Sequence, residues 1–538
     1  PAGRAPAGWD GELVGPFSPE SLLSGVGRQV GPEDELWYHR TFALPEGFQK
    51  RSSDRVALHF GAVDQECRVF VNGELAGEHR GGYLPFTLDI TDILAEGENT
   101  LTVAVTDRTS KGPHAYGKQR VTPGGIWYTP QSGIWQTVWL EAVPENYIKS
   151  LRFTPLYDEK TVRLQIEADR AEGANIVVRK AGEVIAEEWT DEKGEAAVLI
   201  QAEHFRPWSP DDPFLYDVTV TLGEDRVESY FALRKISVVE RQGQKVLALN
   251  DRPIFLSGVL DQGYWPDGLY TAPSDEALAY DIQTMKDLGF NLLRKHIKIE
   301  PLRWYYHCDR LGMLVWQDLV SGGSHMNPLV TQVLPFLGVH LRDWRHQLFG
   351  RGDEAGRDQF VQDLYDTVAL LYNTPSLAAW VPFNEGWGQF DSLQITQLLW
   401  EEDGTRLVDH ASGWHDQGGG DFKSRHVYFH KVRLRNDGRR VLALTEFGGY
   451  SLPLPGHTAS DREFGYRMYR GAEELTAAWR RLYEGEVIPH MERRGLSAAV
   501  YTQLSDVEEE VNGLLTYDRK VCKVDPAVVR EINRRLRF

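Results

Sequence analysis

Two glutamates stand at corresponding places in the sequence, each directly after a run of apolar residues. Glu385 follows LAAWVPFN and precedes Gly386, and Glu446 follows VLALT and precedes FGG. An ionised glutamate is rarely buried without a partner, so each carboxylate either pairs with a basic residue or takes part in a reaction. A single glutamate of this kind more often pairs with an arginine, whereas two in matching positions favour catalysis.

A pair of carboxyl groups can cleave a glycosidic bond. One carboxylic acid protonates the leaving oxygen and later activates water, while the other carboxylate attacks the anomeric carbon, provided that the two groups lie about 5–5.5 Å apart. Closely spaced carboxyl groups also have pKa values that move apart, so one of them can stay protonated near neutral pH. This retaining mechanism requires a fold that brings Glu385 and Glu446 together.

Both glutamates belong to a C-terminal region in which predicted strands and helices alternate. A helix is predicted to begin at the N-cap Ser274, to carry Leu278 and Ile282 on one face and to end at Gly289. Eight runs have the length and composition of strands: IFLSGVLD, NLLRKH, MLVWQD, LAAWVPFNE, RLVDHAS, RHVYFH, VLALTEFGG and AAVYTQLSD. Eight parallel strands alternating with helices make a TIM barrel, whose chemistry lies at the C-terminal ends of the strands. This predicts a (β/α)8 barrel over residues 239–538, with the two glutamates at the ends of strands four and seven.

The N-terminal part of the chain is predicted to be all-β. The segment RVALHFGAVDQECRVFVNGELAG alternates apolar and polar residues and turns at Asn72-Gly73, which is a strong hairpin signal. A single sandwich has about 100 residues, so this part is too long for one. We place a boundary near Pro144, which gives one sandwich over residues 1–144 and another over residues 145–238.

Composition limits the classes of partner. The net charge of −19 argues against nucleic acid or an anionic membrane surface, because both need basic patches. No apolar run reaches the roughly 18 residues of a membrane-spanning helix, and the first residues lack the apolar core of a signal peptide. Cys67, Cys308 and Cys522 are too scattered for a disulfide framework or a metal cluster. A cytoplasmic protein is expected, although a chain that begins at Pro1 leaves a removed leader open.

Short motifs along the chain resemble glycoside hydrolase family 2, which includes β-galactosidases, β-glucuronidases and β-mannosidases. FNE and TEFG match the ends of the family's barrel strands four and seven, and NLLRKH and CDRLGMLVWQD match strands two and three. GGYLPFTLDITDIL and SGIWQTVWLE resemble its jelly-roll sugar-binding domain, and PWSPDDPFLYDVTVTL with YFALRKISV resembles its immunoglobulin-like domain. The resemblance therefore implies a jelly-roll β-sandwich over residues 1–144, an immunoglobulin-like β-sandwich over 145–238 and a catalytic TIM barrel over 239–538.

The resemblance also implies roles at the barrel rim. Glu385 matches the family's acid/base and Glu446 its nucleophile. Asn384 matches the residue that bonds the sugar 2-hydroxyl beside the reacting carbon, and Arg294 matches an arginine that keeps the nucleophile ionised, as a nearby guanidinium would.

Further residues are expected to bind the substrate. His296 matches a family histidine near the first sugar. Tyr428 and His430 stand where the family places an aromatic hydroxyl or a histidine near the nucleophile, and both remain open. Trp387 and Tyr501 are candidate aromatic walls for the sugar, and for each the alternative is simple packing.

The chain departs from its relatives after strands one and eight. Asp261 and Gln262 replace an Asn and a His–Glu pair that β-galactosidases and β-glucuronidases carry. Asp261 is expected to bind the substrate, and the replacement argues against the usual substrate of these relatives. β-Glucuronidases bind the sugar carboxylate with Asn-x-Lys, whereas Gly513-Leu514 follow Asn512 here, with three glutamates nearby. An anionic sugar is therefore not expected. The segment after strand three lacks a metal-binding glutamate of bacterial β-galactosidases, so neither a metal nor another cofactor is expected.

These patterns predict a retaining exo-β-glycosidase that removes a terminal neutral sugar from an oligosaccharide or glycoside. Galactose is slightly favoured over glucose, mannose and a pentose or furanose. The long segment 322–356 after strand three is expected to narrow the pocket. A carbohydrate-binding protein without activity on the same fold and a transglycosylase remain alternatives, and a homo-oligomer remains open.

Overall fold

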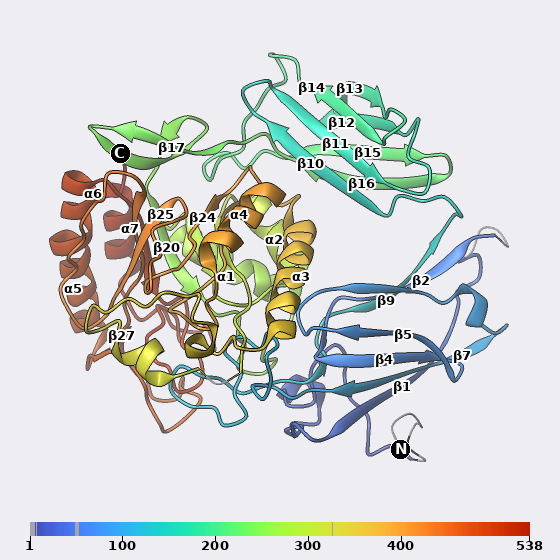
Figure 1. Cartoon of the computed structure of the whole chain (residues 1–538), viewed down its shortest axis with the longest axis horizontal. Coiled ribbons are helices and arrows are strands. Elements are labelled where there is room, and N and C mark those ends of the chain that lie inside the picture. Colours follow the sequence, from blue (N-terminus) through green and yellow to red (C-terminus); the bar gives the residue numbers. More distant parts are fainter. Residues whose placement is uncertain (1–5, 7, 49–52, 325) are drawn as a thin grey trace.

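The computed structural model describes residues 6, 8–48, 53–324 and 326–538. Two β-sandwiches, coloured blue and teal, lie against one side of a larger α/β domain, coloured green to red (Figure 1). Two of the predictions involve residues outside the described part of the chain. They are residues 1–5 and 7, within the N-terminal stretch that lacks a signal-peptide core, and His325, within the long segment after strand three. None of the described helices is long and apolar enough to cross a membrane.

The first sandwich packs two antiparallel sheets with strand orders β1-β7-β4-β5 and β6-β2-β9. Its β4–β5 hairpin turns at Asn72 (φ 53°) and Gly73 (φ 83°), which confirms the predicted turn, since a tight hairpin needs two left-handed residues. The strands are β1 (Glu35–Ala43), β2 (Arg55–Phe60), β3 (Val63–Asp64), β4 (Glu66–Val71), β5 (Glu74–Arg80), β6 (Phe86–Asp89), β7 (Glu98–Thr106), β8 (Gly133–Ile134) and β9 (Val138–Val143).

The second sandwich packs the sheets β10-β11-β14 and β13-β12-β15-β16 around a core that includes Phe153, Ile176 and Val220. Alternate residues of β12 and β15 point into this core, as the period of two requires. The strands are β10 (Ser150–Leu156), β11 (Thr161–Glu167), β12 (Asn175–Lys180), β13 (Glu183–Trp189), β14 (Glu195–Leu199), β15 (Tyr216–Leu222) and β16 (Asp225–Phe231).

The α/β domain contains the eight predicted strands in one parallel sheet, in the order β24-β23-β22-β21-β20-β29-β26-β25. The two end strands meet where the backbone N–H of Asp421 donates to the Val408 carbonyl (2.8 Å) and the Val408 N–H donates to the Asp421 carboxylate (2.8 Å), which closes the barrel. The strands are β20 (Leu256–Asp261), β21 (Leu292–Lys295), β22 (Leu314–Asp318), β23 (Leu377–Val381), β24 (Leu407–Val408), β25 (Phe422–Val427), β26 (Val441–Gly448) and β29 (Leu496–Thr502).

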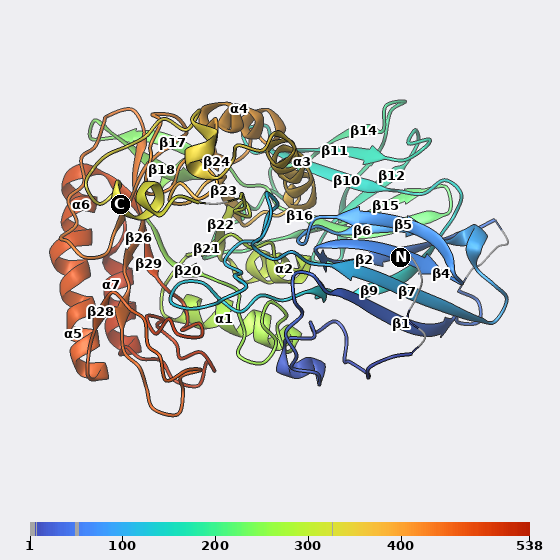
Figure 2. The same ribbon diagram turned by 60° about the horizontal axis from the view of Figure 1, so that its bottom comes forward.

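Helices cover the outside of this barrel (Figure 2). The first begins where predicted, because the Ser274 hydroxyl accepts from the Ala277 N–H, and Leu278 and Ile282 are buried. The helices are α1 (Asp275–Asp287), α2 (Leu302–Leu311), α3 (Glu354–Leu371), α4 (Ser392–Glu402), α5 (Ala472–Leu482), α6 (Ile488–Arg494) and α7 (Pro526–Arg535), with short turns η1 (Leu22–Ser24), η2 (Thr91–Ile93), η3 (Leu329–Val333), η4 (His346–Phe349) and η5 (Tyr483–Val487). The two-residue strands β27 (Tyr450–Ser451) and β28 (Arg467–Met468) pair beside β26.

Strand four is shorter than predicted. It ends at Val381, because Pro382 has no N–H to donate to the ladder. Pairing resumes as a single bridge between Asn384 and Ser412. Glu385 therefore lies on a turn, with a φ of 51°, rather than on the strand itself.

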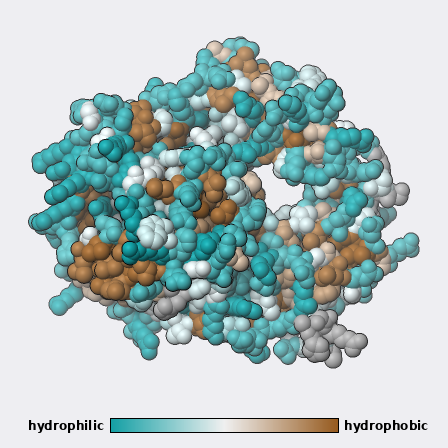
Figure 3. Space-filling view, viewed as in Figure 1, coloured by the Kyte–Doolittle hydropathy of each residue, from teal (hydrophilic) through white to brown (hydrophobic). Residues whose placement is uncertain are grey.

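The segment 322–356 runs over the rim of the barrel and exposes an apolar patch. Figure 3 shows this patch in brown at lower left, where Figure 1 shows a yellow helical turn near the label β27. Leu329, Phe336 and Leu337 are at least half exposed there. The Phe336 ring also packs on Trp414, 5.4 Å between centroids.

A small sheet, β17 (Ile236–Arg241), β18 (Gln244–Leu249) and β19 (Arg252–Pro253), closes the N-terminal end of the barrel. Just before it, the buried Arg234 donates to the carbonyls of Pro375, Leu377 and Thr405 (3.0–3.2 Å). One guanidinium thus joins the end of the second sandwich to strands four and five.

Replacing this residue tests its contribution to stability. Arg234→Met is expected to lower the free energy of unfolding by about 2 kcal/mol or more, because each buried carbonyl left without a donor costs about 1–3 kcal/mol. Thermal unfolding followed by circular dichroism measures the effect. Arg226→Met, which removes an exposed ion pair with Glu228, should change stability by less than about 1 kcal/mol. Equal shifts in the two variants would contradict this role for Arg234.

Candidate active site

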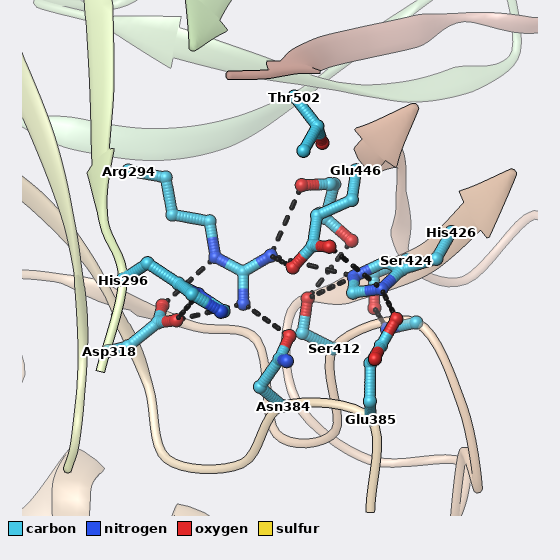
Figure 4. Close-up of polar contacts among 12 residues, drawn as sticks. Arg294, His296, Asp318, Asn384, Glu385, Ser412, Ser424, His426, Glu446 and Thr502 are labelled. Carbon is cyan, nitrogen blue, oxygen red and sulfur yellow. Dashed lines mark hydrogen bonds and ion pairs between the residues drawn. The ribbon is translucent and has the colours of Figure 1, made fainter. Parts of the chain in front are cut away.

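The C-terminal ends of the barrel strands bring the two glutamates together (Figure 4). Glu385 and Glu446 are 7% and 4% exposed. One oxygen from each carboxyl group and one ring nitrogen of His426 lie within 4.8 Å of one another. Residues from three separate segments therefore form one buried cluster at the barrel rim, where TIM barrels carry their chemistry.

Arg294 of β21 is the centre of this cluster. Its guanidinium donates to Glu446 Oε1 (3.1 Å) and Asn384 Oδ1 (2.8 Å) and pairs with both carboxylate oxygens of Asp318 (2.9 and 3.0 Å). Burial opposes its charge, but Asp318 and Glu446 outweigh burial and raise the pKa of Arg294 above its usual value. A planar guanidinium can hold several acceptors in fixed directions, so Arg294 sets the positions of both Glu446 and Asn384.

His296 is oriented by the carboxylate of Asp318. Its Nδ1 lies 2.8 Å from Asp318 Oδ2, and burial lowers the pKa of His296 well below its usual range. The ring is therefore neutral, with Nδ1–H donating to Asp318, and its Nε2 is an acceptor. The ring lies 6.2 Å from the ring of Trp387, between centroids, so two of the predicted substrate-binding residues are neighbours.

Glu446 accepts a second hydrogen bond from the Tyr428 hydroxyl. Burial, with Glu446 next, raises the pKa of Tyr428 well above 10, so the hydroxyl keeps its proton and remains a donor. The Tyr428 ring stacks on Tyr466 at 4.0 Å, and its hydroxyl lies 3.2 Å from the Thr502 hydroxyl. Glu446 thus accepts hydrogen bonds from a guanidinium and from a hydroxyl, and together they fix the direction of its carboxylate.

Glu385 has a different environment. Burial raises its pKa to about 7, although Lys118 and Arg294 act in the opposite direction. Its Oε1 lies 2.8 Å from His426 Nδ1, and its backbone N–H donates to the Ser412 carbonyl (3.0 Å). The two glutamates thus differ in the way that an acid and a carboxylate nucleophile must differ.

His426 of β25 is a site residue that our sequence reasoning missed. Burial lowers its pKa to about 4, so the ring is neutral. Its Nε2 lies 3.2 Å from Ser412 Oγ and 3.5 Å from Arg294 Nη1, and its Nδ1 lies 2.8 Å from Glu385 Oε1. The signal was in the sequence: Ser424 and His426 alternate along β25 and Tyr428 follows just after its end, so the same period of two predicts the same inward side for all three.

Three predicted residues lie elsewhere. Asp261 accepts from the Lys295 ammonium (2.7 Å), outside the cluster around the glutamates. Tyr501 packs against Phe447 and Trp479 on the helical side of the barrel. His430 is exposed, and of the two alternatives at the end of β25 the structure brings Tyr428 to Glu446. A shift of one position along a strand reverses the facing of a side chain, which is why Asp261 and Tyr501 point outward while Arg294 and Thr502 point inward.

The trio of Glu385, His426 and Glu446 has the spacing of a metal-binding group. Its surroundings fit a cation poorly, because Arg294 already places a positive charge 3.1 Å from Glu446. A divalent ion would also require Glu385 to ionise, against the effect of its burial. The residues present are therefore better suited to proton transfer than to metal binding.

Family models match most of the chain. "Glycosyl hydrolases family 2, sugar binding domain" matches residues 28–144, "Glycosyl hydrolases family 2" matches residues 146–234, and "Glycosyl hydrolases family 2, TIM barrel domain" matches residues 239–431. The chain belongs to glycosyl hydrolase family 2. The predicted fold class, a sugar-binding β-sandwich, an immunoglobulin-like domain and a C-terminal TIM barrel, is confirmed.

Curated members of family 2 match over part of their length. A β-galactosidase of Thermoanaerobacter pseudethanolicus is 29% identical over 54% of this chain and 40% of its own length. A β-galactosidase of Lactococcus lactis is 28% identical over 61% of this chain and 33% of its own length. The chain thus spans less than half the length of these relatives.

Solved structures share the fold over almost the whole chain. A β-D-glucuronidase of Dictyoglomus thermophilum superposes with a TM-score of 0.75 at 17% identity and covers 97% of this chain and 93% of its own. A family 2 β-galacturonidase of Eisenbergiella tayi gives a TM-score of 0.71 at 19% identity and covers 98% and 93%. At these identities the likeness concerns the fold.

The buried Glu385 carries a testable cost in stability. Its folded-state pKa of about 7 lies above the ordinary 4.5, so the stability that it contributes is present below pH 4.5 and is lost as the pH rises through 7. Glu385→Gln should therefore match the wild type near pH 4.5 and be more stable at pH 9, by on the order of 3 kcal/mol. Thermal unfolding at both pH values measures this, with the exposed Glu203→Gln as control. A pH-independent difference would contradict the raised pKa.

Proposed function

We propose that the protein is a retaining exo-β-glycosidase that hydrolyses a terminal, neutral, β-linked sugar through a covalent glycosyl-enzyme intermediate. The observation that carries this proposal is the approach of Glu385 and Glu446, with carboxyl oxygens within 4.8 Å. This close approach agrees better with the separation of about 5–5.5 Å in retaining enzymes than with the about 6.5–9.5 Å of inverting ones.

Glu446 is the proposed nucleophile. The hydrogen bonds from Arg294 and Tyr428 fix the direction of its carboxylate. When the carboxylate attacks the anomeric carbon, its negative charge is lost to the new bond, and both donors remain to stabilise the leaving carboxylate in the second step.

Glu385 is the proposed acid/base. A carboxyl group with a pKa of about 7 is protonated in a substantial fraction of molecules at neutral pH and can protonate the leaving oxygen. Once Glu446 has been esterified, its charge no longer faces Glu385, so Glu385 ionises more readily and can accept a proton from water. His426, hydrogen-bonded to Glu385, positions the carboxyl group for both steps.

Asn384 is the proposed ligand of the sugar 2-hydroxyl. Its Oδ1 accepts from Arg294, while its buried Nδ2 forms no hydrogen bond within the described part of the chain. A buried donor without a partner costs free energy, and a bound hydroxyl would recover it. Trp387, beside His296, offers an aromatic face to the sugar ring.

A neutral sugar, with galactose slightly favoured, remains our proposal for the glycone. Asn512 donates to Glu510 (2.8 Å), and no lysine follows it as in the Asn-x-Lys arrangement. The β-galactosidases among the curated relatives support galactose, although they are much longer than this chain. A binding protein without activity and a transglycosylase remain the alternatives.

A panel of nitrophenyl α- and β-glycosides tests the reaction. Wild type should release nitrophenol from one neutral β-glycoside, and Glu446→Gln should lower kcat by at least about 10³-fold, because it removes the nucleophile. A 2-deoxy-2-fluoro glycoside of the same sugar should label Glu446, which peptide mass spectrometry locates. Glu531→Gln, at an exposed ion pair with Arg480, serves as control. A folded wild type that hydrolyses nothing would favour the binding protein, and glycoside formed with added alcohol in preference to hydrolysis would favour the transglycosylase.

The pH dependence tests the acid. The kcat/KM of wild type should fall as the pH rises above about 7, because the acid that protonates the leaving group ionises there. With a dinitrophenyl leaving group, which needs little protonation, Glu385→Ala should keep glycosyl-enzyme formation and lose this alkaline limb. An unchanged alkaline limb in Glu385→Ala would show that another group is the acid.

A further inference from the structure

A long loop of the first sandwich, residues 107–132 between β7 and β8, lies on the rim of the barrel. Figure 2 shows it as light-blue coil that leaves the sandwich and runs across the α/β domain. On one side it pairs with the segment after β22: the N–H groups of Tyr116 and Gly117 donate to the Ser321 carbonyl (3.0 and 2.9 Å). The Tyr116 hydroxyl also donates to the Gly323 carbonyl (3.1 Å).

The other side of the loop is held by the three glutamates that follow β29. Glu508 accepts from the Thr129 N–H (2.9 Å), Glu509 accepts from the Gly125 N–H (2.9 Å), and Glu510 accepts from the Tyr128 hydroxyl. These carboxylates, which we had interpreted as a sign against an anionic sugar, therefore serve to anchor the sandwich on the barrel.

This anchoring places Lys118 inside the site. The side chain is 5% exposed, and its ammonium lies over the rings of Trp387 (4.8 Å) and Trp127 (5.5 Å). Burial lowers the pKa of Lys118, while the charges of Glu510, Glu446 and Glu385 raise it. The ammonium thus lies over Trp387, two residues after Glu385, in a part of the structure where the charges of both glutamates act on it.

Lys118 differs from the other buried lysines. Lys295, Lys298 and Lys523 each have a carboxylate within 2.6–2.9 Å. The Lys118 ammonium has no hydrogen-bond or ion-pair partner among the residues that the structure describes, only aromatic faces. Lys118 is only 5% exposed, so a ligand that covered its ammonium would displace the remaining water and would have to supply an acceptor in its place.

We propose that Lys118 is a glycone-binding residue, whose ammonium donates hydrogen bonds to hydroxyl oxygens of a neutral terminal sugar seated between the sandwich loop and the glutamate pair. This inference rests on the proposed function and assigns part of its substrate site to the N-terminal domain. The tryptophan rings beside Lys118 suit the C–H face of a sugar, and the ammonium suits its hydroxyl edge.

The charges around Lys118 favour hydroxyls over a sugar carboxylate. The negative charges of Glu446 and Glu510 already balance the single positive charge of Lys118. Arg294 already forms ion pairs with Asp318 and Glu446. An additional carboxylate would lie among like charges in a poorly solvated pocket, which is unfavourable. A neutral polyhydroxylated ring meets no such repulsion.

The experiment compares Lys118→Met and Lys118→Gln with Lys111→Met, an exposed lysine on the same loop. The substrates are the best neutral nitrophenyl β-glycoside of the panel, its monodeoxy analogues and the corresponding β-uronide. Both Lys118 variants should lower kcat/KM for the neutral glycoside by about 10- to 150-fold, the worth of a hydrogen bond to a charged donor, while Lys111→Met matches wild type. The analogue that lacks the hydroxyl bound by Lys118 should be a poor substrate for the wild type. The Lys118 variants should lower its kcat/KM little further, because the substitution and the missing hydroxyl remove the same interaction.

A second readout separates binding from a merely structural role. Loss of the positive charge should move the alkaline limb of the kcat/KM profile to higher pH in Lys118→Met, because Lys118 lowers the pKa of Glu385. A loss of thermal stability alone would not move this limb. Lys118 variants with wild-type kcat/KM on every analogue, or a loss confined to the β-uronide, would overturn the proposal. A wild type that hydrolyses no glycoside would instead refute the proposed function.

Discussion

The buried guanidinium of Arg294 is the interaction on which the site depends. It lies on the inward face of β21 and reaches Asp318 of β22, Asn384 after β23 and Glu446 of β26. A single rigid, permanently charged group therefore ties together residues from four barrel strands. Its own position is secured by Asp318, because a bidentate pair fixes both direction and plane.

The placement of Arg294 also explains why the two glutamates behave differently. Glu446 lies within hydrogen-bond reach of the guanidinium, whereas Glu385 contacts a neutral imidazole, that of His426. Two identical side chains, with carboxyl oxygens less than 5 Å apart, can then take different roles because their hydrogen-bond partners differ. Thr445, Ser412 and Ser424 fill the remaining polar positions of the inward faces.

Much of this arrangement could be predicted from the sequence, because parallel strands place their carboxyl ends on one rim. Strand counting located Glu385 and Glu446 there, and the resemblance to family 2 supplied Arg294 and Asn384. It was harder to predict whether a side chain at the end of a strand points into the barrel or toward the helices. Asp261 and Tyr501 point toward the helices, because successive side chains alternate and an error of one position reverses the side.

Contacts between domains could not be predicted at all from local patterns. Lys118 and Trp127 belong to a loop of the first sandwich, far from the barrel in sequence. Nothing in the adjacent sequence indicates that they lie close to Trp387 and the glutamate pair. The run Glu508–Glu510 looked like an electrostatic barrier to anionic substrates. It is instead a set of acceptors for backbone N–H groups and a hydroxyl of that loop, a role that only the tertiary structure reveals.

The anchoring of this loop has a consequence for modularity. The barrel is not structurally independent of the first sandwich, because residues 107–132 of that domain hydrogen-bond to Gly323 and Glu509 and bring Lys118 over the ring of Trp387. Sequence change in that loop could alter the choice of sugar while every barrel residue stays the same. The N-terminal sandwich, which looks like an accessory module, would then be the part of the chain through which substrate range diversifies.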